Sequence, residues 1–226
     1  MSYRLAIFDF DGTLADSAAW FMGVLNDVAR TYGFRIVSED EMAMLRGRDN
    51  RAIIRYLGVP AWKMPLIANH MRMLVARDAG AIRLFPGVEN MLRSLSERGL
   101  HLAIVSSNRE DTIRRILGPD TARLISTYAC GAALFGKARK FRQVLRRTGF
   151  RPDEAIAIGD EVRDIQAARR TGLASGAVGW GYATPELLRE HRPTLEFGSV
   201  AEIAQRLAGP RQAIGESAGM APRADA

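Results

Sequence analysis

Apolar residues along the chain fall either in short unbroken runs or in longer stretches with a helical spacing. The short runs lie at residues 4–10, 101–106, 155–159 and 174–178. Runs of this length that are rich in β-branched residues are typical of strands buried on both faces. Apolar positions three or four residues apart occur between these runs, in residues 88–98, 111–117, 137–148 and 163–171. Strands that alternate with helices predict an α/β fold with a doubly wound parallel sheet.

The segment between the first two runs has a different pattern. Residues 18–32, 39–45, 50–57 and 61–77 have helical apolar spacing, and no convincing strand separates them. Phe85, Pro86 and Gly87 then break the chain before the next helix. We therefore predict a Rossmann-like core of residues 1–16 and 84–208, interrupted by an all-helical cap of residues 17–83. Residues 209–226 mix Pro and Gly with charges and lack periodicity, which predicts a disordered tail.

Composition narrows the class of protein. A chain of 226 residues that is 47% hydrophobic can form an α/β core with a modest second domain. No stretch approaches the roughly 18 uninterrupted apolar residues of a membrane span, and Asp9 and Asp11 interrupt the apolar N-terminal run. A single cysteine, Cys130, cannot form an intrachain disulfide. We therefore expect a cytoplasmic protein without a membrane span or a secretory signal peptide.

The net charge of the chain favours anionic partners. It is +7 at pH 7, and much of the positive charge comes from arginine. This sign fits a phosphorylated metabolite, and it also fits nucleic acid. Besides Lys137, five cations fall in the helix predicted at 137–148, which we interpret as a solvated outer face. These cations are Arg139, Lys140, Arg142, Arg146 and Arg147.

Two acidic residues stand where the first predicted strand ends. Asp9 and Asp11 are two residues apart, so in an extended chain they share a face. Ligands of parallel α/β sheets bind at the carboxyl ends of the strands. Two carboxylates there repel each other in a core but suit a divalent cation. A simple strand-ending turn of Asp and Gly explains this segment equally well on its own.

Four later positions strengthen the functional interpretation. Ser106 ends the second core strand, Lys137 opens a helix, and Asp160 and Asp164 follow the third core strand. Taken singly, each has an ordinary explanation as a turn or cap residue, a surface cation or an acid at a helix start. Their order along the chain, together with the first acidic pair, favours a catalytic site.

These segments carry a resemblance to a known family. DFDGTLADS, AIVSSN, GK at the start of a helix, and IGDEVRD occur in this order and resemble the four motifs of the haloacid dehalogenase-like superfamily. LFPGVENMLRSLSERGLHLAIVSSN and VGWGY are similar to its phosphoglycolate phosphatase-like branch with a helical cap. The resemblance implies a hydrolase of phosphoric monoesters. It further implies a magnesium-dependent phosphatase acting on a small phosphomonoester, either phosphoglycolate-like or a sugar phosphate.

The resemblance also assigns catalytic roles. Asp9 would attack phosphorus and form an aspartyl-phosphate, and Asp11 would protonate the leaving oxygen and then activate water. Ser106 and Lys137 would stabilise the charge on the phosphoryl oxygens. Asp164, one helical turn after the third-strand acid, is expected to hold Lys137 in place. Because a leaving halide needs no proton, the acid at Asp11 favours a phosphatase over a dehalogenase.

Mg²⁺ is the expected cofactor, since it takes hard oxygen ligands and keeps several waters. The predicted partial ligand set is Asp9, the backbone carbonyl of Asp11, and Asp160. The residues expected to support these ligands without binding the metal are Asp164, Glu161 and Thr13.

The predicted cap resembles the lid of this family, which closes over the site and excludes water. Residues 45–51 break the helical periodicity with a glycine, and Arg48 or Arg51 is a candidate to bind a carboxylate or second phosphate of the substrate. A solvated turn between cap helices is the competing interpretation. With Ser106, Ser107 and Lys137, these arginines make up the predicted substrate-binding residues.

Two alternatives to a phosphatase stay open. A phosphosugar mutase of the β-phosphoglucomutase type would use the same motifs and pass the phosphoryl group to a second sugar hydroxyl instead of water. A non-catalytic binding protein would keep the fold and its basic surface, but it would not need a proton-transferring carboxylate. We expect a small phosphorylated metabolite as the partner, neither a membrane nor nucleic acid, and a monomer or homodimer.

Overall fold

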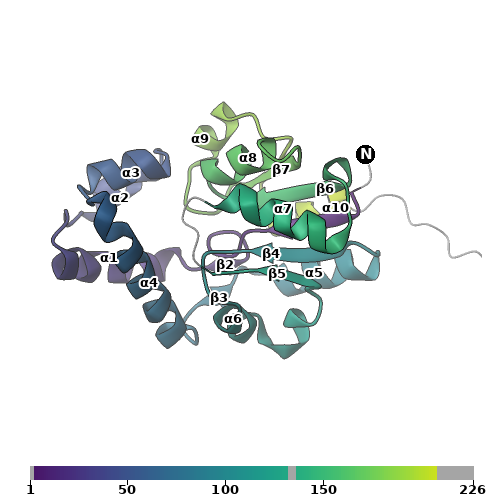
Figure 1. Ribbon diagram of the computed structural model, residues 1–226, viewed down its shortest axis with the longest axis horizontal. Helices are drawn as coiled ribbons and strands as arrows, with labels where there is room; N and C mark the ends of the chain where they lie inside the picture. Colours follow the sequence, from purple (N-terminus) through teal and green to yellow (C-terminus); the bar gives the residue numbers. More distant parts are fainter. Residues whose placement is uncertain (1–2, 132–135, 208–226) are drawn as a thin grey trace, which may run out of the picture.

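A six-stranded parallel sheet forms the centre of the core (Figure 1). The computed structural model describes residues 3–131 and 136–207. The strand order is β5-β4-β1-β6-β7-β8, and every neighbouring pair is parallel. The strands are β1 (Leu5–Phe8), β4 (His101–Val105), β5 (Thr127–Ala129), β6 (Ala155–Gly159), β7 (Ala174–Val178) and β8 (Leu195–Phe197). The predicted fold class is confirmed.

Both faces of the sheet are buried, which explains the unbroken apolar runs. On β1, Ala6 and Phe8 belong to one hydrophobic cluster, while Leu5 and Ile7 belong to the cluster on the opposite face. The first cluster is covered by α5 (Val88–Glu97), α6 (Glu110–Ala122) and α10 (Val200–Leu207). The second is covered by α7 (Lys137–Thr148) and α8 (Val162–Arg169). Helices therefore lie on both faces, as a doubly wound sheet requires.

The core also contains elements that the apolar pattern does not single out. They are the strands β5 and β8, the helices α9 (Pro185–Glu190) and α10, and the 3₁₀ turn η2 (Pro152–Glu154). Both strands have three residues, which is too short for a distinct periodic signal. In α6 the predicted stop at residue 117 has a physical basis, because Gly118 has φ 74° and Pro119 follows it.

Four α-helices lie between the strands β2 (Ala15–Asp16) and β3 (Arg83–Leu84), which pair antiparallel. They are α1 (Ala18–Tyr32), α2 (Glu39–Leu45), α3 (Asn50–Tyr56) and α4 (Met64–Asp78), with the 3₁₀ turn η1 (Ala61–Lys63) before α4. Figure 1 shows them to the left of the sheet. They bury a separate cluster that includes Leu25, Met42 and Leu57. The division into a core and a cap of residues 17–83 stays a prediction.

Local signals set the ends of these helices. Ser38 caps α2, and its hydroxyl accepts from the backbone N–H of Glu41 while the Glu41 carboxylate accepts from the N–H of Ser38. Gly33 ends α1 in the left-handed conformation. No helix within the described ranges is long and apolar enough to cross a membrane. The tail predicted at 209–226 lies outside the described residues.

The central strands should dominate stability. Ile104 on β4 is fully buried, so replacing it with alanine leaves a cavity, and we expect Ile104→Ala to lower the free energy of unfolding by about 2–5 kcal/mol. The matched change Ile36→Ala, at a position that is 50% exposed, should cost about 1 kcal/mol or less. Urea denaturation followed by circular dichroism measures both. Equal losses in the two variants would contradict the assignment of the core.

Candidate active site

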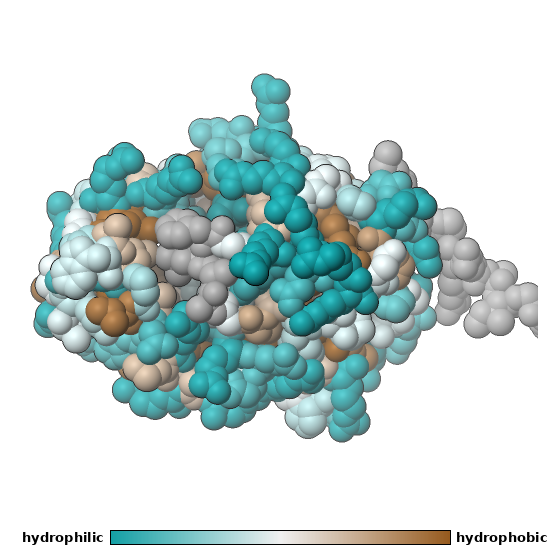
Figure 2. Space-filling model, in the orientation of Figure 1, coloured by the Kyte–Doolittle hydropathy of each residue, from teal (hydrophilic) through white to brown (hydrophobic). Residues whose placement is uncertain are grey.

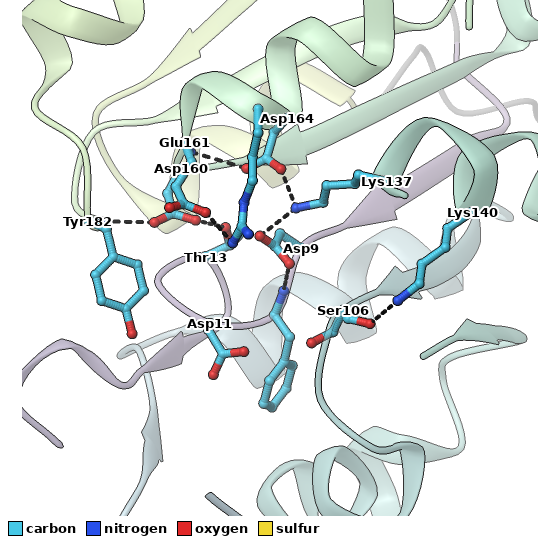
Figure 3. A network of polar contacts seen from close by, with 12 residues as sticks. Asp9, Asp11, Thr13, Ser106, Lys137, Lys140, Asp160, Glu161, Asp164 and Tyr182 are labelled. Carbon is cyan, nitrogen blue, oxygen red and sulfur yellow. Dashed lines mark hydrogen bonds and ion pairs between the residues drawn. The ribbon is translucent and has the colours of Figure 1, made fainter. Parts of the chain in front are cut away.

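The carboxyl ends of three adjacent strands meet at one place in the molecule. β1 lies between β4 and β6, so the loops that follow these strands are neighbours. The helices α7 and α8 begin beside the same loops (Figure 3). The predicted catalytic and metal-binding residues gathered there, with the expected lysine partner, are Asp9, Asp11, Ser106, Lys137, Asp160 and Asp164.

Three buried carboxylates form the centre of this site. Asp9, Asp160 and Asp164 each offer an oxygen, and these oxygens all lie within 4.8 Å of one another. Burial raises the pKa of Asp160, and it raises the pKa of Asp164 to about 6. Hard carboxylate oxygens at this spacing fit a divalent cation, which would offset their mutual repulsion. The chemistry of the donor set thus suits a metal ion.

Lys137 supplies a positive charge to the same cluster. Its Nζ lies 2.5 Å from Asp9 Oδ2 and forms an ion pair with Asp164. Although burial opposes the charged ammonium, Asp164 and Asp9 together raise the pKa of Lys137. The contact expected between Asp164 and Lys137 is present, but Asp164 also lies within the potential metal cluster. Its place there makes it a further candidate ligand beside the predicted set.

The carboxylate of Asp160 is held at both oxygens. Thr13 Oγ1 donates to Oδ1 at 2.9 Å, and the backbone N–H of Tyr182 donates to Oδ2 at 2.8 Å. The loops approach so closely that a Cβ at Gly12 or Gly181 would overlap Asp160, and Gly12 has φ 71°. Asp160 therefore has little freedom to move independently of residues 12–13 and 181–182.

Asp11 lies on the other side of the cluster, in contact with the loop after β4. Asn108 Nδ2 donates to Asp11 Oδ2 at 2.7 Å, and the Asn108 backbone N–H donates to Ser106 Oγ at 3.1 Å. Figure 3 shows the Asp11 carboxylate apart from Asp160, so the side chain is not part of the acidic cluster. Burial, followed by the negative charge of Asp9, raises the pKa of Asp11 to about 7. A carboxyl group with this pKa can give or take a proton near neutral pH.

The prediction that five cations of the 137–148 helix, other than Lys137, lie on a solvated face is wrong for one of them. Arg139, Arg142, Arg146 and Arg147 are exposed, and Figure 2 shows a hydrophilic surface over α7. Lys140 is buried, and its Nζ donates to the backbone carbonyls of Ser106 at 2.5 Å and Gly131 at 2.6 Å. Burial lowers the pKa of Lys140 to about 8, so the ammonium is still largely charged at neutral pH. It ties the loop after β4 to the chain beyond β5.

The residues predicted to support the site or to bind substrate differ in how close they lie to the acidic cluster. Glu161 caps α8, pairs with Arg163 and accepts from Asn50 Nδ2 at 2.6 Å. Arg48 is exposed and donates to Met44 Sδ. The remaining predicted residues are placed as follows: Ser107 is half-buried beside Ser106, and Arg51 lines a cavity of about 180 Å³ together with Lys137 and Arg163. Substrate binding by these residues stays a prediction.

Some site residues carry only a weak sequence signal. Asn108 lies in the AIVSSN segment and Tyr182 in VGWGY, yet the contact that each makes joins loops far apart in the chain. Lys140 was detectable, because it lies on the same helical stripe as the buried Phe141 and Val144.

A parallel α/β core with a cluster of buried carboxylates at the carboxyl ends of its strands is typical of an enzyme whose active site can bind a metal ion. The family model described as haloacid dehalogenase-like hydrolase matches residues 6–178, more than half of the chain. The chain therefore belongs to the haloacid dehalogenase-like hydrolase family, as the motifs predicted.

Similar proteins agree with this assignment. A phosphoglycolate phosphatase of Synechococcus elongatus is 36% identical over 177 residues, covering 78% of this chain and 84% of the relative. A phosphoglycolate phosphatase of Agrobacterium fabrum is 31% identical over 214 residues, covering 90% and 91%. A solved structure of a predicted phosphatase from Clostridium acetobutylicum has a TM-score of 0.78 at 22% identity, covering 92% of this chain and 99% of that one. The predicted family, fold and hydrolase class are confirmed.

Lys140 should stabilise the loops around the site. We expect Lys140→Met to leave the carbonyls of Ser106 and Gly131 without their donor and to lower the free energy of unfolding by about 1–3 kcal/mol. Arg139→Met on the exposed side of the same helix is the matched control and should change it by about 0.5 kcal/mol or less. Chemical denaturation of both variants checks this, and a Lys140→Met protein as stable as the control would refute it.

Proposed function

We propose that the chain is a magnesium-dependent phosphatase that hydrolyses a small phosphomonoester through an aspartyl-phosphate on Asp9. The observation that carries this proposal is the arrangement around Asp9: a buried carboxylate, with Lys137 at 2.5 Å and two further buried acids beside it. Membership of the haloacid dehalogenase-like hydrolases supports it. The phosphoglycolate phosphatases of Synechococcus elongatus and Agrobacterium fabrum, which this chain resembles, support a small phosphorylated acid as the substrate class.

The charge balance of the site favours binding of a phosphoryl group. Asp9, the backbone carbonyl of Asp11, and Asp160 would hold Mg²⁺, with Asp164 close enough to contribute. A bound ion would supply positive charge that offsets the charge of the phosphoryl oxygens. Lys137 adds a second positive charge next to the nucleophile. The ammonium of Lys137 is thus already in place to offset negative charge of the phosphoryl group when the substrate binds.

The first chemical step transfers the phosphoryl group to Asp9. A carboxylate oxygen of Asp9 forms a bond to phosphorus as the bond to the ester oxygen breaks, and the leaving oxygen takes a proton from the Asp11 carboxyl. With a pKa of about 7, a substantial fraction of Asp11 carries that proton at neutral pH. The hydrogen bond from Asn108 to Oδ2 fixes the orientation of the Asp11 carboxyl group.

The second step returns the enzyme to its starting state. Asp11, now a carboxylate, takes a proton from a water molecule as the water oxygen attacks phosphorus, and the bond to the Asp9 oxygen breaks. The products are inorganic phosphate and free Asp9, with the proton back on Asp11.

Ser106 is suited to donate to a phosphoryl oxygen. Its Oγ accepts from the Asn108 backbone N–H, which leaves the hydroxyl proton available for another acceptor. Lys140 fixes the Ser106 main chain from behind the loop. Ser107, Arg48 and Arg51 complete the proposed substrate contacts, and of these Arg51 is the one beside a cavity that reaches Lys137.

The identity of the nucleophile can be tested directly. Asp9→Asn should lower phosphate release by at least about a thousandfold, because the amide cannot attack phosphorus. Asp153 is exposed and lies just before β6, at the end of this strand opposite the site, so Asp153→Asn is the matched control and should keep wild-type activity. Phosphate release is measured on 2-phosphoglycolate and a panel of sugar phosphates with Mg²⁺ or EDTA, with circular dichroism to verify folding.

Wild-type activity that survives EDTA, or a folded Asp9→Asn protein with full activity, would contradict the proposal. Activity that appears only with a sugar bisphosphate activator, with little net phosphate release, would indicate the mutase reaction instead.

The role of Asp11 predicts a dependence on the leaving group. Asp11→Asn should slow hydrolysis of an alkyl phosphate by about 10²- to 10⁴-fold, since an alkoxide needs a proton to leave. With p-nitrophenyl phosphate, whose phenolate leaves without a proton, formation of the phosphoenzyme should be affected much less. Pre-steady-state burst kinetics on the two substrates separate formation of the phosphoenzyme from its hydrolysis. Equal losses on both substrates would argue against proton donation by Asp11.

A further inference from the structure

Several polar contacts between the α1–α4 segment and the core lie at the loop after β7. Arg46, at the end of α2, donates from Nη2 to the carbonyl of Gly181 at 3.0 Å and from Nε to the carbonyl of Tyr182 at 3.1 Å. In return, the backbone N–H of Thr184 donates to the Arg46 carbonyl at 3.0 Å. One cap residue thus exchanges three hydrogen bonds with residues 181–184.

Other contacts from the same segment reach the same place. Ser17 Oγ and Tyr182 Oη form a hydrogen bond of 2.9 Å, and the ring of Phe21 packs edge-on against that of Tyr182, with centroids 5.8 Å apart. Asn50, at the start of α3, donates to Glu161, the residue that follows Asp160. The side-chain contacts from these helices therefore end at Glu161, Gly181 or Tyr182, which follow Asp160 in the chain, lie against it or donate to it.

The loop that receives these contacts is the one that holds Asp160. The N–H of Tyr182 donates to Asp160 Oδ2, and Trp180 Nε1 donates to the carbonyl of Thr13, whose hydroxyl holds Asp160 Oδ1. A Cβ at Gly181 would overlap Asp160, so the backbone of the loop lies directly against this residue. A displacement of residues 180–182 must therefore change how Asp160 is presented.

The character of Arg46 fits a reversible contact better than a packing role. Its side chain is exposed, and its partners are the backbone carbonyls of Gly181 and Tyr182. It can detach without opening the hydrophobic cluster of the helices, which consists of other residues. A guanidinium group suits this geometry, because it presents two N–H groups in a fixed fork to two neighbouring acceptors.

We propose that Arg46 is a positioning residue that couples closure of the cap to the metal-binding carboxylate Asp160 through the backbone of residues 181–182. The proposal rests on the proposed magnesium-dependent function and on the predicted cap of residues 17–83. Coupling between two equilibria is reciprocal, so metal binding favours the closed cap to the same extent that closure favours metal binding. The cap then closes most firmly on a site that is ready to react.

The test compares Mg²⁺ binding to wild type, Arg46→Ala and Arg46→Lys by isothermal titration calorimetry on the full chain. We expect the Mg²⁺ dissociation constant of Arg46→Ala to rise by about tenfold and that of Arg46→Lys to lie between, because lysine keeps the charge but lacks the fork. Arg55→Ala, an exposed arginine on α3, is the matched control and should bind as wild type does. Thermal unfolding verifies that the variants fold.

Two readouts separate coupling from a merely structural effect. At limiting Mg²⁺, kcat of Arg46→Ala should fall several-fold, and saturating Mg²⁺ should restore it. Amide exchange in residues 179–184 should be faster in Arg46→Ala than in Arg55→Ala in the presence of EDTA, when no metal contributes.

The outcomes are distinguishable. If wild type binds Mg²⁺ and Arg46→Ala binds it equally well, the coupling is refuted while the phosphatase proposal stands. A loss of kcat that saturating Mg²⁺ does not restore would also refute it. If wild type binds no Mg²⁺ at all, the metal site and the coupling fall together.

Discussion

The structure of the site depends on keeping three carboxylates buried side by side. Asp9, Asp160 and Asp164 repel one another, and burial makes their negative charge more costly still. The chain offsets this cost with groups fixed around them: the ammonium of Lys137, and the donors from Thr13 and the backbone of Tyr182. Such an arrangement needs a rigid surrounding backbone, and its hard oxygen donors suit a divalent cation.

The parallel sheet supplies this rigidity. β1 and β6 are neighbours in the middle of the sheet and are packed on both faces, so their carboxyl ends, with Asp9 and Asp160, have a fixed separation. The helices α7 and α8 begin at the same edge and add Lys137 and Asp164. Glycines at 12 and 181 let two loops reach Asp160 at the distance of a hydrogen bond. A core built from apolar runs thus serves to hold charges in place.

The sequence predicted those parts of the structure that depend on local pattern. Buried strands, the helical segment 18–78 and the polar residues at strand ends all follow from periodicity and position, and the resemblance of the motifs then assigned their roles. Charge alone predicts an exposed Lys140, and this prediction fails. The position of Lys140 next to Phe141, on the side of α7 that faces the sheet, indicates that it is buried. The contacts of Asn108 and Arg46 join segments about 100 residues apart or more, and no local pattern encodes such a pairing.

The acidic cluster by itself cannot decide what the enzyme acts on. Under the proposed mechanism, the reaction at Asp9 needs only a phosphoryl group, which all phosphomonoesters share, and the same nucleophile would serve whether water or a sugar hydroxyl accepts that group. The difference lies in what reaches Asp11 after the leaving group has departed, and therefore in how the helical segment closes over the site. The contacts of Arg46, Asn50 and Ser17 hold that segment against the loops beside Asp160. Under the proposed mechanism, choice of acceptor and assembly of the metal site would both depend on this one interface, so a change at this interface should alter both together.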